Sequence, residues 1–186
     1  MPERAADEKA QEWLTACMKD QDSSGGVVEC VISGMPAGIG EPVFDKLDAR
    51  LGNALFSIGA VKAVEIGDGT AVSVAKGSEN NDPFRIRDGR IVKAANHAGG
   101  ILGGISDGSD TVMRAHIKPT PSIFRPQETA GADGQERTVS IRGRHDPVIV
   151  PRAVVVVECM AALTVTDLLF SNMSARLDKI LSFYGK

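Results

Sequence analysis

Apolar residues recur at helical spacing in three parts of the chain. Residues 5–18 predict a first helix, and its apolar positions are Ala6, Ala10, Trp13, Leu14 and Cys17. A second helix is predicted from Pro42, which can open it, to Gly59, which would end it. The apolar face of that helix consists of Phe44, Leu47, Leu51, Leu55 and Ile58. After a turn at 143–147, the remainder of the chain predicts a long helix.

Three further segments have the β-branched, apolar composition of strands. They span 27–33, 60–66 and 111–117. The glycine turn at 67–69 closes the second of these strands. Two polar stretches, 77–90 and 125–137, are predicted to be long flexible loops, the first an exposed excursion or lid. Loops of this length inside a compact domain are uncommon unless they carry function.

The order of these elements predicts one domain over residues 1–186. Helices alternate with strands, and no internal repeat or linker divides the chain. The pattern suits an α+β fold or a layered sandwich of sheets and helices, and it does not choose between the two.

Composition places the chain among ordinary soluble globular proteins. Hydrophobic residues make up 42% and charged residues 24%. Aromatic residues are only 4% and the net charge is -3, so neither stacking surface nor positive field favours nucleic acid. Cys17, Cys30 and Cys159 have no metal-ligand spacing and are predicted to be small core residues.

The most hydrophobic stretch, 153–170, contains Glu158 and Asp167. These carboxylates would cost several kcal/mol in hydrocarbon, so a buried helix is favoured over a membrane span. The amino-terminal residues show no apolar signal region. We therefore expect a cytoplasmic protein without membrane contact.

The strongest candidate for chemistry is the segment Gly143-Arg144-His145-Asp146-Pro147. It places two basic side chains beside a carboxylate, on a turn that Pro147 stiffens. Such a carboxylate can move a proton or orient a ring nitrogen. The alternative is a salt-bridged surface turn.

The segment Lys118-Pro119-Thr120-Pro121-Ser122 follows a predicted strand. One ammonium and two hydroxyls can hold a phosphate. The alternative is a kinked strand end, because the two prolines remove two backbone donors.

Glycine pairs occur in the segment 96–106, separated by two aliphatic residues. They let the backbone approach a planar ligand or a neighbouring strand. The spacing is not that of a dinucleotide-binding fold. No histidine pair has metal spacing, so a metal site is not predicted, and no serine lies in a nucleophile elbow.

Taken in order, six blocks resemble chorismate synthase. They are Gly25 to Glu29, Pro36 to Leu47, Val64 to Gly69, Asn96 to Ser106, Lys118 to Thr120 and Gly143 to Pro147. The resemblance covers nearly the whole chain and corresponds to the carboxy-terminal half of that family.

The resemblance implies a portion of a layered β-α-β sandwich fold and a lyase of aromatic amino acid biosynthesis. That family eliminates phosphate from 5-enolpyruvylshikimate 3-phosphate to give chorismate, and it needs reduced FMN. Its members are homotetramers, and their amino-terminal half supplies two histidines and several arginines that are missing here. The resemblance also implies a link to NADP, and it leaves open whether the enzyme or a separate reductase reduces the flavin.

The resemblance also implies residue roles. The cofactor contacts would be Gly59, Ala60, Gly103, Lys118, Pro119, Thr120, Pro121, Ser122 and Arg144. Asp146 would be the catalytic group that works beside the flavin ring. The family usually has asparagine or proline where Gly59 stands, and often serine where Pro121 stands.

Two functional hypotheses follow. In the first, the chain is a piece of chorismate synthase that is inactive on its own. In the second, it is a non-catalytic FMN-binding or assembly module. A third and weaker possibility is a structural domain that binds nothing.

Overall fold

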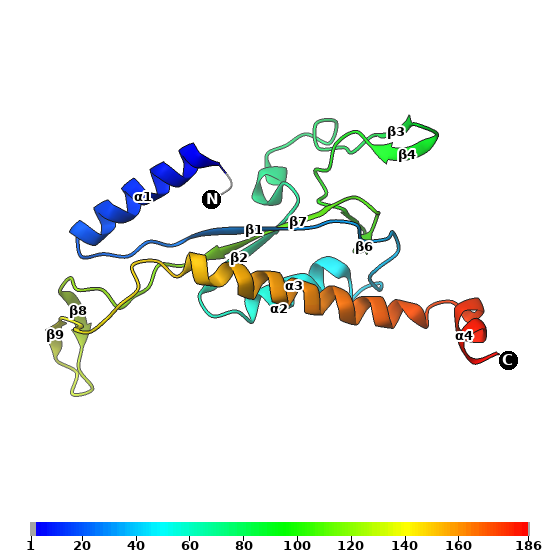
Figure 1. Ribbon diagram of the computed structural model, residues 1–186. Helices are drawn as coiled ribbons and strands as arrows, with labels where there is room; N and C mark the ends of the chain where they lie inside the picture. Colours follow the sequence, from blue (N-terminus) through cyan, green and yellow to red (C-terminus); the bar gives the residue numbers. More distant parts are fainter. Residues whose placement is uncertain (1–2, 186) are drawn as a thin grey trace.

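The computed structural model describes residues 3–185 and is built on a three-stranded antiparallel sheet (Figure 1). β7 (Thr111–Ile117) is the central strand, between β1 (Gly26–Ile32) and β2 (Val61–Ile66). Ala115 faces Val28 on one side and Val64 on the other, and a bulge interrupts the β2 pairing between Val61 and Ala63. All three strands lie within two residues of the positions that the sequence predicts.

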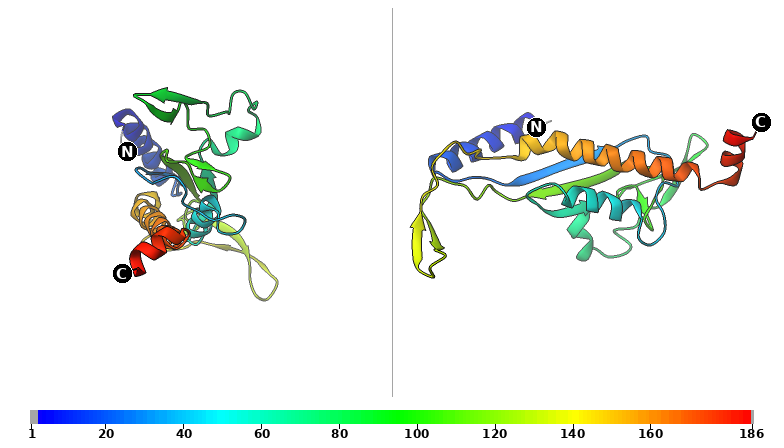
Figure 2. Two further views of the ribbon diagram at one scale, coloured as in Figure 1. Left: turned by 90° about the vertical axis from the view of Figure 1, so that its right-hand side faces the viewer. Right: turned by 90° about the horizontal axis from the view of Figure 1, so that it is seen from below.

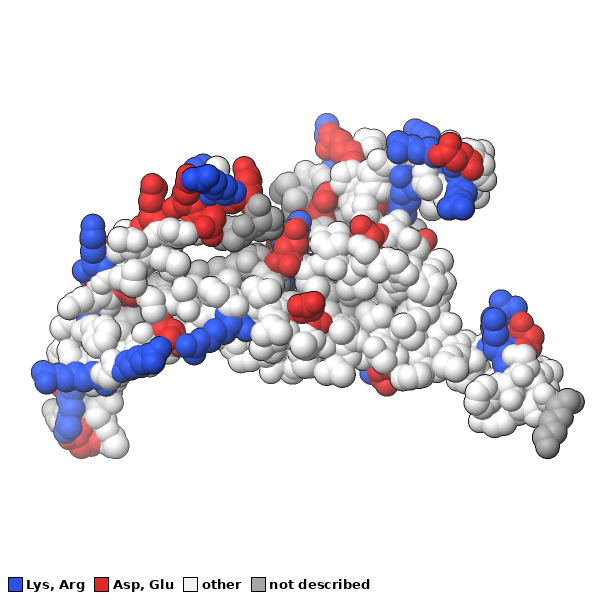
Figure 3. All heavy atoms as spheres, viewed as in Figure 1, with Lys and Arg blue, Asp and Glu red and all other residues white. Residues whose placement is uncertain are grey.

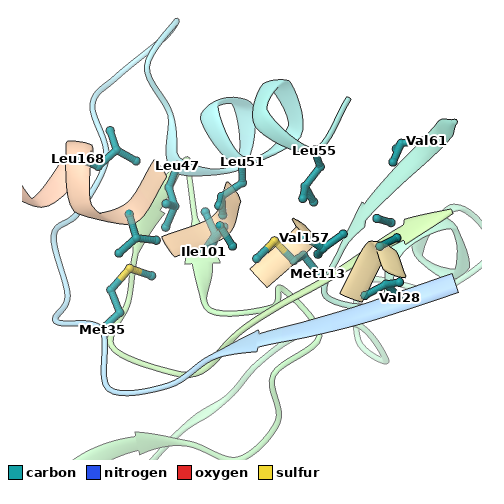
Figure 4. Packing of buried hydrophobic residues seen from close by; sticks show 14 of the residues in the cluster. Val28, Met35, Leu47, Leu51, Leu55, Val61, Ile101, Met113, Val157 and Leu168 are labelled. Atoms are coloured by element: carbon teal, nitrogen blue, oxygen red, sulfur yellow. The ribbon is translucent and has the colours of Figure 1, made fainter. Parts of the chain in front are cut away.

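Two helices cover one face of this sheet. Figure 2 shows α2 (Leu47–Phe56) and α3 (Val150–Met173) on the same side of the strands. The core between them is aliphatic apart from two methionines (Figure 4). Its members on the helices and the central strand include Leu47, Leu51, Leu55, Met113, Ala115, Val157 and Leu168. The chain thus contributes one sheet layer and one helix layer to the predicted α+β sandwich.

α2 begins later than the sequence predicts. The helix starts at Leu47 and not near Pro42, because Val43 has a positive φ of 69° that helical backbone does not allow. Phe44 is consequently 87% exposed and is not part of the apolar face. The helix ends at Phe56, and the left-handed residue before β2 is Ala60 and not Gly59.

α3 is buried on one face only, which corrects the prediction of a buried helix. Ala153, Val157, Ala161 and Leu168 are among the residues that face the core. Most of its remaining apolar side chains are exposed, including Val154, Val155, Leu163 and Phe170. By length and composition alone α3 could also cross a membrane. A short exposed helix, α4 (Leu177–Tyr184), follows it.

The first helix, α1 (Arg4–Lys19), forms as predicted but buries no residue within this chain. Trp13, on its predicted apolar face, is 62% exposed, and its indole N–H donates to Ser24 Oγ over 2.9 Å. Figures 1 and 2 place α1 on the side of the sheet opposite α2 and α3.

The cysteines are only partly core residues. Cys17 and Cys30 are half-buried, while Cys159 on α3 is exposed, so the prediction of a core position is wrong for Cys159. Burial, and then the nearby Glu158 carboxylate, raises the pKa of the Cys30 thiol. That shift disfavours the nucleophilic thiolate.

A β-hairpin begins within each predicted loop and extends two or three residues beyond its end. β3 (Phe84–Arg87) pairs with β4 (Arg90–Lys93), and β8 (Gln127–Ala130) pairs with β9 (Glu136–Val139). The glycine segment forms a smaller hairpin, β5 (Ile101–Leu102) and β6 (Ile105–Ser106), and η1 (Gly69–Ser73) follows β2. The two polar stretches have a mixed polar composition, so the alternation of apolar and polar residues that marks a strand is not visible in their sequence.

A buried ion triad joins the β3–β4 hairpin to the glycine segment. The Lys93 ammonium contacts the carboxylates of Asp82, at 3.3 Å, and Asp107. The three side chains are only 5%, 5% and 10% exposed. Asp82 also accepts the backbone N–H groups of His97, over 2.8 Å, and Ala98, over 3.1 Å. The stretch predicted to be an exposed excursion or lid is therefore fixed at its base.

Candidate functional site

Three loops meet at the end of the sheet where β7 leaves Ile117. Ser23 Oγ donates to the Thr120 carbonyl over 2.6 Å, and the Ser24 N–H donates to the Pro147 carbonyl over 2.8 Å. A Cβ on Gly25 would lie 2.5 Å from the Ile117 carbonyl oxygen, so only glycine allows this approach. These contacts bring the Lys118 segment and the Asp146 turn together, as the site predictions require.

Ala60 lies at the same place. Its carbonyl accepts the Lys118 N–H over 2.9 Å, one residue beyond the paired part of β7. The neighbouring Gly59 is exposed, and a Cβ there would meet nothing within 4 Å. Gly59 and Ala60 are therefore next to the Lys118 segment in space, although about sixty residues separate them in sequence.

A cavity of about 270 Å³ opens between these loops. It is lined by Ser122, His145 and Asp146, together with Met18, Phe124 and other residues of the three loops. Ligand sites of small molecules usually enclose roughly 300–1,000 Å³. The pocket in this chain thus has room for part of a flavin-sized molecule.

Two polar atoms of these loops are buried and have no hydrogen-bond partner among residues 3–185. They are Thr120 Oγ1 and His145 Nε2. Phe124 packs edge-on against the His145 ring, with the centroids 5.3 Å apart. Because an unpaired buried polar group is costly, these two atoms are candidate contacts for water or a polar ligand.

The Asp146 carboxylate is held by Arg152, in the first turn of α3. Arg152 Nη1 lies 2.8 Å from Asp146 Oδ2, and Nη2 donates to Oδ1 over 3.2 Å. This two-point contact fixes the plane of the carboxylate. The turn at 143–147 is therefore salt-bridged, as the alternative interpretation of a salt-bridged surface turn predicts. The Asp146 carboxylate of the same turn also lines the cavity.

Lys118 and Arg144 are two exposed cations of the region. Among residues 3–185, no carboxylate lies within 4 Å of either side chain. Both side chains are therefore available to an anionic ligand, and their predicted contact with the cofactor stays a prediction.

Gly103 is not brought to this site. It lies in the turn between β5 and β6, near the other end of β7. Gly99 and Gly100, in the same segment, bond to the backbone around the start of β7. Seven strand residues span about 20 Å, so β7 separates the Gly103 turn from the Lys118 segment, which follows the other end of the strand.

Gly103 lines a different cavity of about 360 Å³. His97 also lines it, and the His97 Nδ1 atom lies 2.6 Å from Asp68 Oδ2. Within the described part of the chain, no cluster of three histidine, cysteine or acidic side chains could hold a metal ion.

Comparison with known proteins decides the family. The sequence profile of the family described as chorismate synthase matches residues 1–170. The chain belongs to the chorismate synthase family.

The chorismate synthase of Lachnoclostridium phytofermentans is 59% identical over 187 residues, covering 100% of this chain and 51% of that protein. The chorismate synthase of Methanosarcina barkeri is 54% identical over 171 residues, covering 89% of this chain and 47% of its own. The chain spans about half the length of the curated relatives it matches, and this half is the carboxy-terminal one.

The fold agrees with this assignment. A crystal structure of chorismate synthase superposes with a TM-score of 0.75 at 28% identity, covering 94% of this chain and 45% of the solved one. The layered arrangement of sheet and helices therefore belongs to the chorismate synthase fold.

Sequence reasoning missed three contributors to the site. Arg152 follows Asp146 by six residues, and only the start of α3 brings its guanidinium back to the carboxylate. Met18 and Phe124 line the cavity from segments with no motif. Pro151 was the one available signal for Arg152. Proline is frequent in a first helical turn, so it indicates that the helix, and with it Arg152, begins close to the Asp146 turn.

Proposed function

We propose that this chain forms the flavin side of a chorismate synthase. The full site would eliminate phosphate from 5-enolpyruvylshikimate 3-phosphate to give chorismate, with reduced FMN as cofactor. The observation that carries the proposal is the meeting of Ser122, His145 and Asp146 at one cavity in a member of this family.

The residues of this site fit an anionic, hydrogen-bonding cofactor. Lys118 and Arg144 offer unpaired positive charge, and Thr120 Oγ1 offers a buried hydroxyl without a partner. When bound, reduced FMN would supply electron density that helps the allylic phosphate leave. Lys118, Thr120 and Ser122 would hold the cofactor, while Arg144 offsets negative charge beside it.

Asp146 would accept the ring proton that the elimination releases. In that reaction the allylic C–O bond to phosphate breaks, a C–H bond breaks, and a new double bond forms. Arg152 keeps the Asp146 carboxylate in one orientation, since the two groups meet at two points. The carboxylate therefore faces the cavity in a fixed position.

The site needs groups from outside this chain. The cavity beside Asp146 is smaller than a usual ligand pocket, and one apolar face of α3 is open. We propose that the other half of the family's length covers this face and supplies the substrate-binding arginines and the two histidines. The intact protein would be a cytoplasmic homotetramer, and the three free cysteines fit a reducing compartment.

Complementation tests this proposal. The 186-residue chain is mixed or co-expressed with the amino-terminal half of the Lachnoclostridium phytofermentans relative. Phosphate release is then measured anaerobically with reduced FMN. We expect turnover from the pair and none from either piece. FMN binding by the pair without turnover would favour the non-catalytic module.

A matched pair of variants tests the role of Asp146. Asp146→Asn should lower turnover of the complemented pair by roughly 10²–10⁴-fold and leave FMN binding intact, because only the proton acceptor is lost. Asp133→Asn, which removes an exposed carboxylate on the β8–β9 hairpin, should change neither property. Unchanged turnover in Asp146→Asn would refute the proposed base.

A further inference from the structure

Met18 is the only sulfur-containing residue in the described part of the chain that lines the cavity beside Asp146. The cysteines Cys17, Cys30 and Cys159 do not line it. The Met18 side chain is 53% exposed, so a small oxidant in the cavity can reach its thioether. Peroxides convert a thioether to a sulfoxide, which is a common oxidative modification of methionine. Met18 is therefore the sulfur most directly open to an oxidant formed in this cavity.

Met18 stands at the carboxy-terminal end of α1, and local contacts fix this end of the helix. The Met18 carbonyl accepts the Gln21 N–H over 3.1 Å, in the turn that ends the helix. Asp22 Oδ2 lies 3.2 Å from Arg125 Nη1, which ties this turn to the loop after Ser122. Figure 3 shows acidic side chains gathered on α1, and such side chains keep their surface of the helix in water. The end of the helix, and not burial of its sides, thus places Met18 at the cavity.

Three apolar residues line the cavity together with Met18. They are Ile123, Phe124 and Pro147. Walls of this kind usually hold flat and largely apolar ligands, while a few polar groups fix the orientation of the ligand. Under the proposed function, the flavin ring binds in this cavity and therefore close to the Met18 thioether.

We propose that Met18 is an oxidative modification site of this cavity, which rests on the proposed function because the oxidant comes from the cofactor. In air, reduced flavin passes an electron pair and two protons to dioxygen, which gives oxidised flavin and hydrogen peroxide. The Met18 sulfur attacks one oxygen of the peroxide, and the O–O bond breaks. The sulfur loses an electron pair, the peroxide gains it, and the products are methionine sulfoxide and water.

Oxidation of Met18 lowers the affinity of the cavity for the cofactor. A sulfoxide is polar, and it lies among Ile123, Phe124 and Pro147, so flavin binding buries its oxygen without a partner. The cost of burying an unpaired polar group raises the FMN dissociation constant by roughly two- to thirtyfold. Methionine sulfoxide reductases restore the thioether, so the loss of affinity is reversible. Exposure to air thus releases a cofactor that would otherwise keep producing peroxide.

Met173 is a matched reference within the same chain. Its side chain, at the end of α3, is 59% exposed and does not line the cavity. Met35 and Met113 are buried in the core. Hydrogen peroxide added to the solution without flavin should therefore oxidise Met18 and Met173 at comparable rates and leave Met35 and Met113 intact. A preference for Met18 over Met173 requires that the peroxide forms in the cavity.

Peptide mass spectrometry of the complemented pair tests this proposal. FMN is reduced repeatedly in air by NADH and a flavin reductase, and catalase removes peroxide from the bulk solution. We expect Met18 to gain the mass of one oxygen atom several times faster than Met173. FMN affinity, measured by flavin fluorescence, should fall after this treatment and recover with methionine sulfoxide reductase. In Met18→Leu the affinity should be the same before and after the treatment, because leucine has no sulfur to oxidise.

The fluorescence titration separates failure of this proposal from failure of the proposed function. If FMN binds the pair but Met18 and Met173 are oxidised alike, or neither is oxidised, the proposal for Met18 is refuted and the proposed function stands. It is equally refuted if the affinity of Met18→Leu falls as much as that of the wild-type chain. If FMN does not bind the pair at all, the proposed function and the Met18 site are both overturned.

Discussion

Replacing Lys93 by methionine removes the only ammonium from the buried ion triad while keeping most of the side-chain volume. In the folded chain this ammonium lies between the carboxylates of Asp82 and Asp107, and all three side chains are at most 10% exposed. The Lys93→Met variant would leave two carboxylates buried without a counter-ion. The triad connects the β3–β4 hairpin to the glycine segment, so its loss acts on both.

The expected size of the effect follows from burial. Removing one partner of a buried ion pair usually costs about 3–5 kcal/mol. Backbone N–H donors from His97 and Ala98 to Asp82, and from Ser109 to Asp107, offset part of that cost. We therefore expect a loss of about 3 kcal/mol, a large share of the roughly 5–15 kcal/mol that stabilises a typical domain.

Urea unfolding followed by circular dichroism measures the loss, and amide hydrogen exchange locates it. Exchange should accelerate first in residues 82–107, because the triad acts there. Lys62→Met, in which an exposed lysine on β2 is replaced, is the matched control and should change stability little. Adding Asp107→Asn to Lys93→Met should recover part of the loss, since one unpaired charge is then removed.

Two results would refute this reasoning. One is a destabilisation of Lys93→Met below about 1 kcal/mol, the level of an exposed pair. The other is uniform acceleration of exchange over the chain with no preference for residues 82–107.

Three further predictions concern stability. Gly67→Ala should lower the free energy of unfolding, measured by urea titration, by more than about 1–3 kcal/mol. The reason is that φ at Gly67 is +59° and the new Cβ would lie 2.1 Å from the His97 carbonyl oxygen. Gly77→Ala is the control and should be neutral, because nothing lies within 4 Å of a Cβ there. Leu51→Ala should cost about 2–5 kcal/mol by the same measurement, since the side chain is fully buried, and a cost below 1 kcal/mol would contradict the core assignment. Acid should release the triad: burial alone would raise the pKa of Asp82, but hydrogen bonds and Lys93 outweigh it and hold that pKa below its ordinary value. The stabilisation by the triad is therefore complete above about pH 4 and is lost as the pH falls further. Hydrogen exchange of residues 82–107, measured between about pH 5 and 2, would show this loss.

The site illustrates how far the sequence reaches. The segments around Lys118 and Asp146 carry short motifs with cations, hydroxyls and a carboxylate, and the structure brings both segments to one cavity. Gly103 belongs to an equally clear glycine motif, yet the length of β7 separates it from that cavity. Spacing along the chain contains no information about which end of a strand a motif will occupy.

Local sequence determined the sheet and the family. The strands at 26–32, 61–66 and 111–117 follow from β-branched composition, and the helix around Leu51 follows from apolar residues three and four positions apart. The six ordered motifs were enough to recognise the family, because each motif is defined by residue type and spacing alone. The start of α2 was not predictable in the same way, since the left-handed backbone at Val43 results from the path of the preceding loop.

Only the tertiary structure decided which apolar surfaces are buried. The sequence of α3 is apolar on all sides, and packing against β1 and α2 uses one face and leaves the other open. α1 buries no residue fully, and the apolar side chains Phe84, Ile86 and Ile91 of the β3–β4 hairpin are exposed. Periodicity shows that a helix or strand has an apolar face. Which surface covers that face depends on contacts between distant segments and between chains, and a single sequence does not give the distances between them.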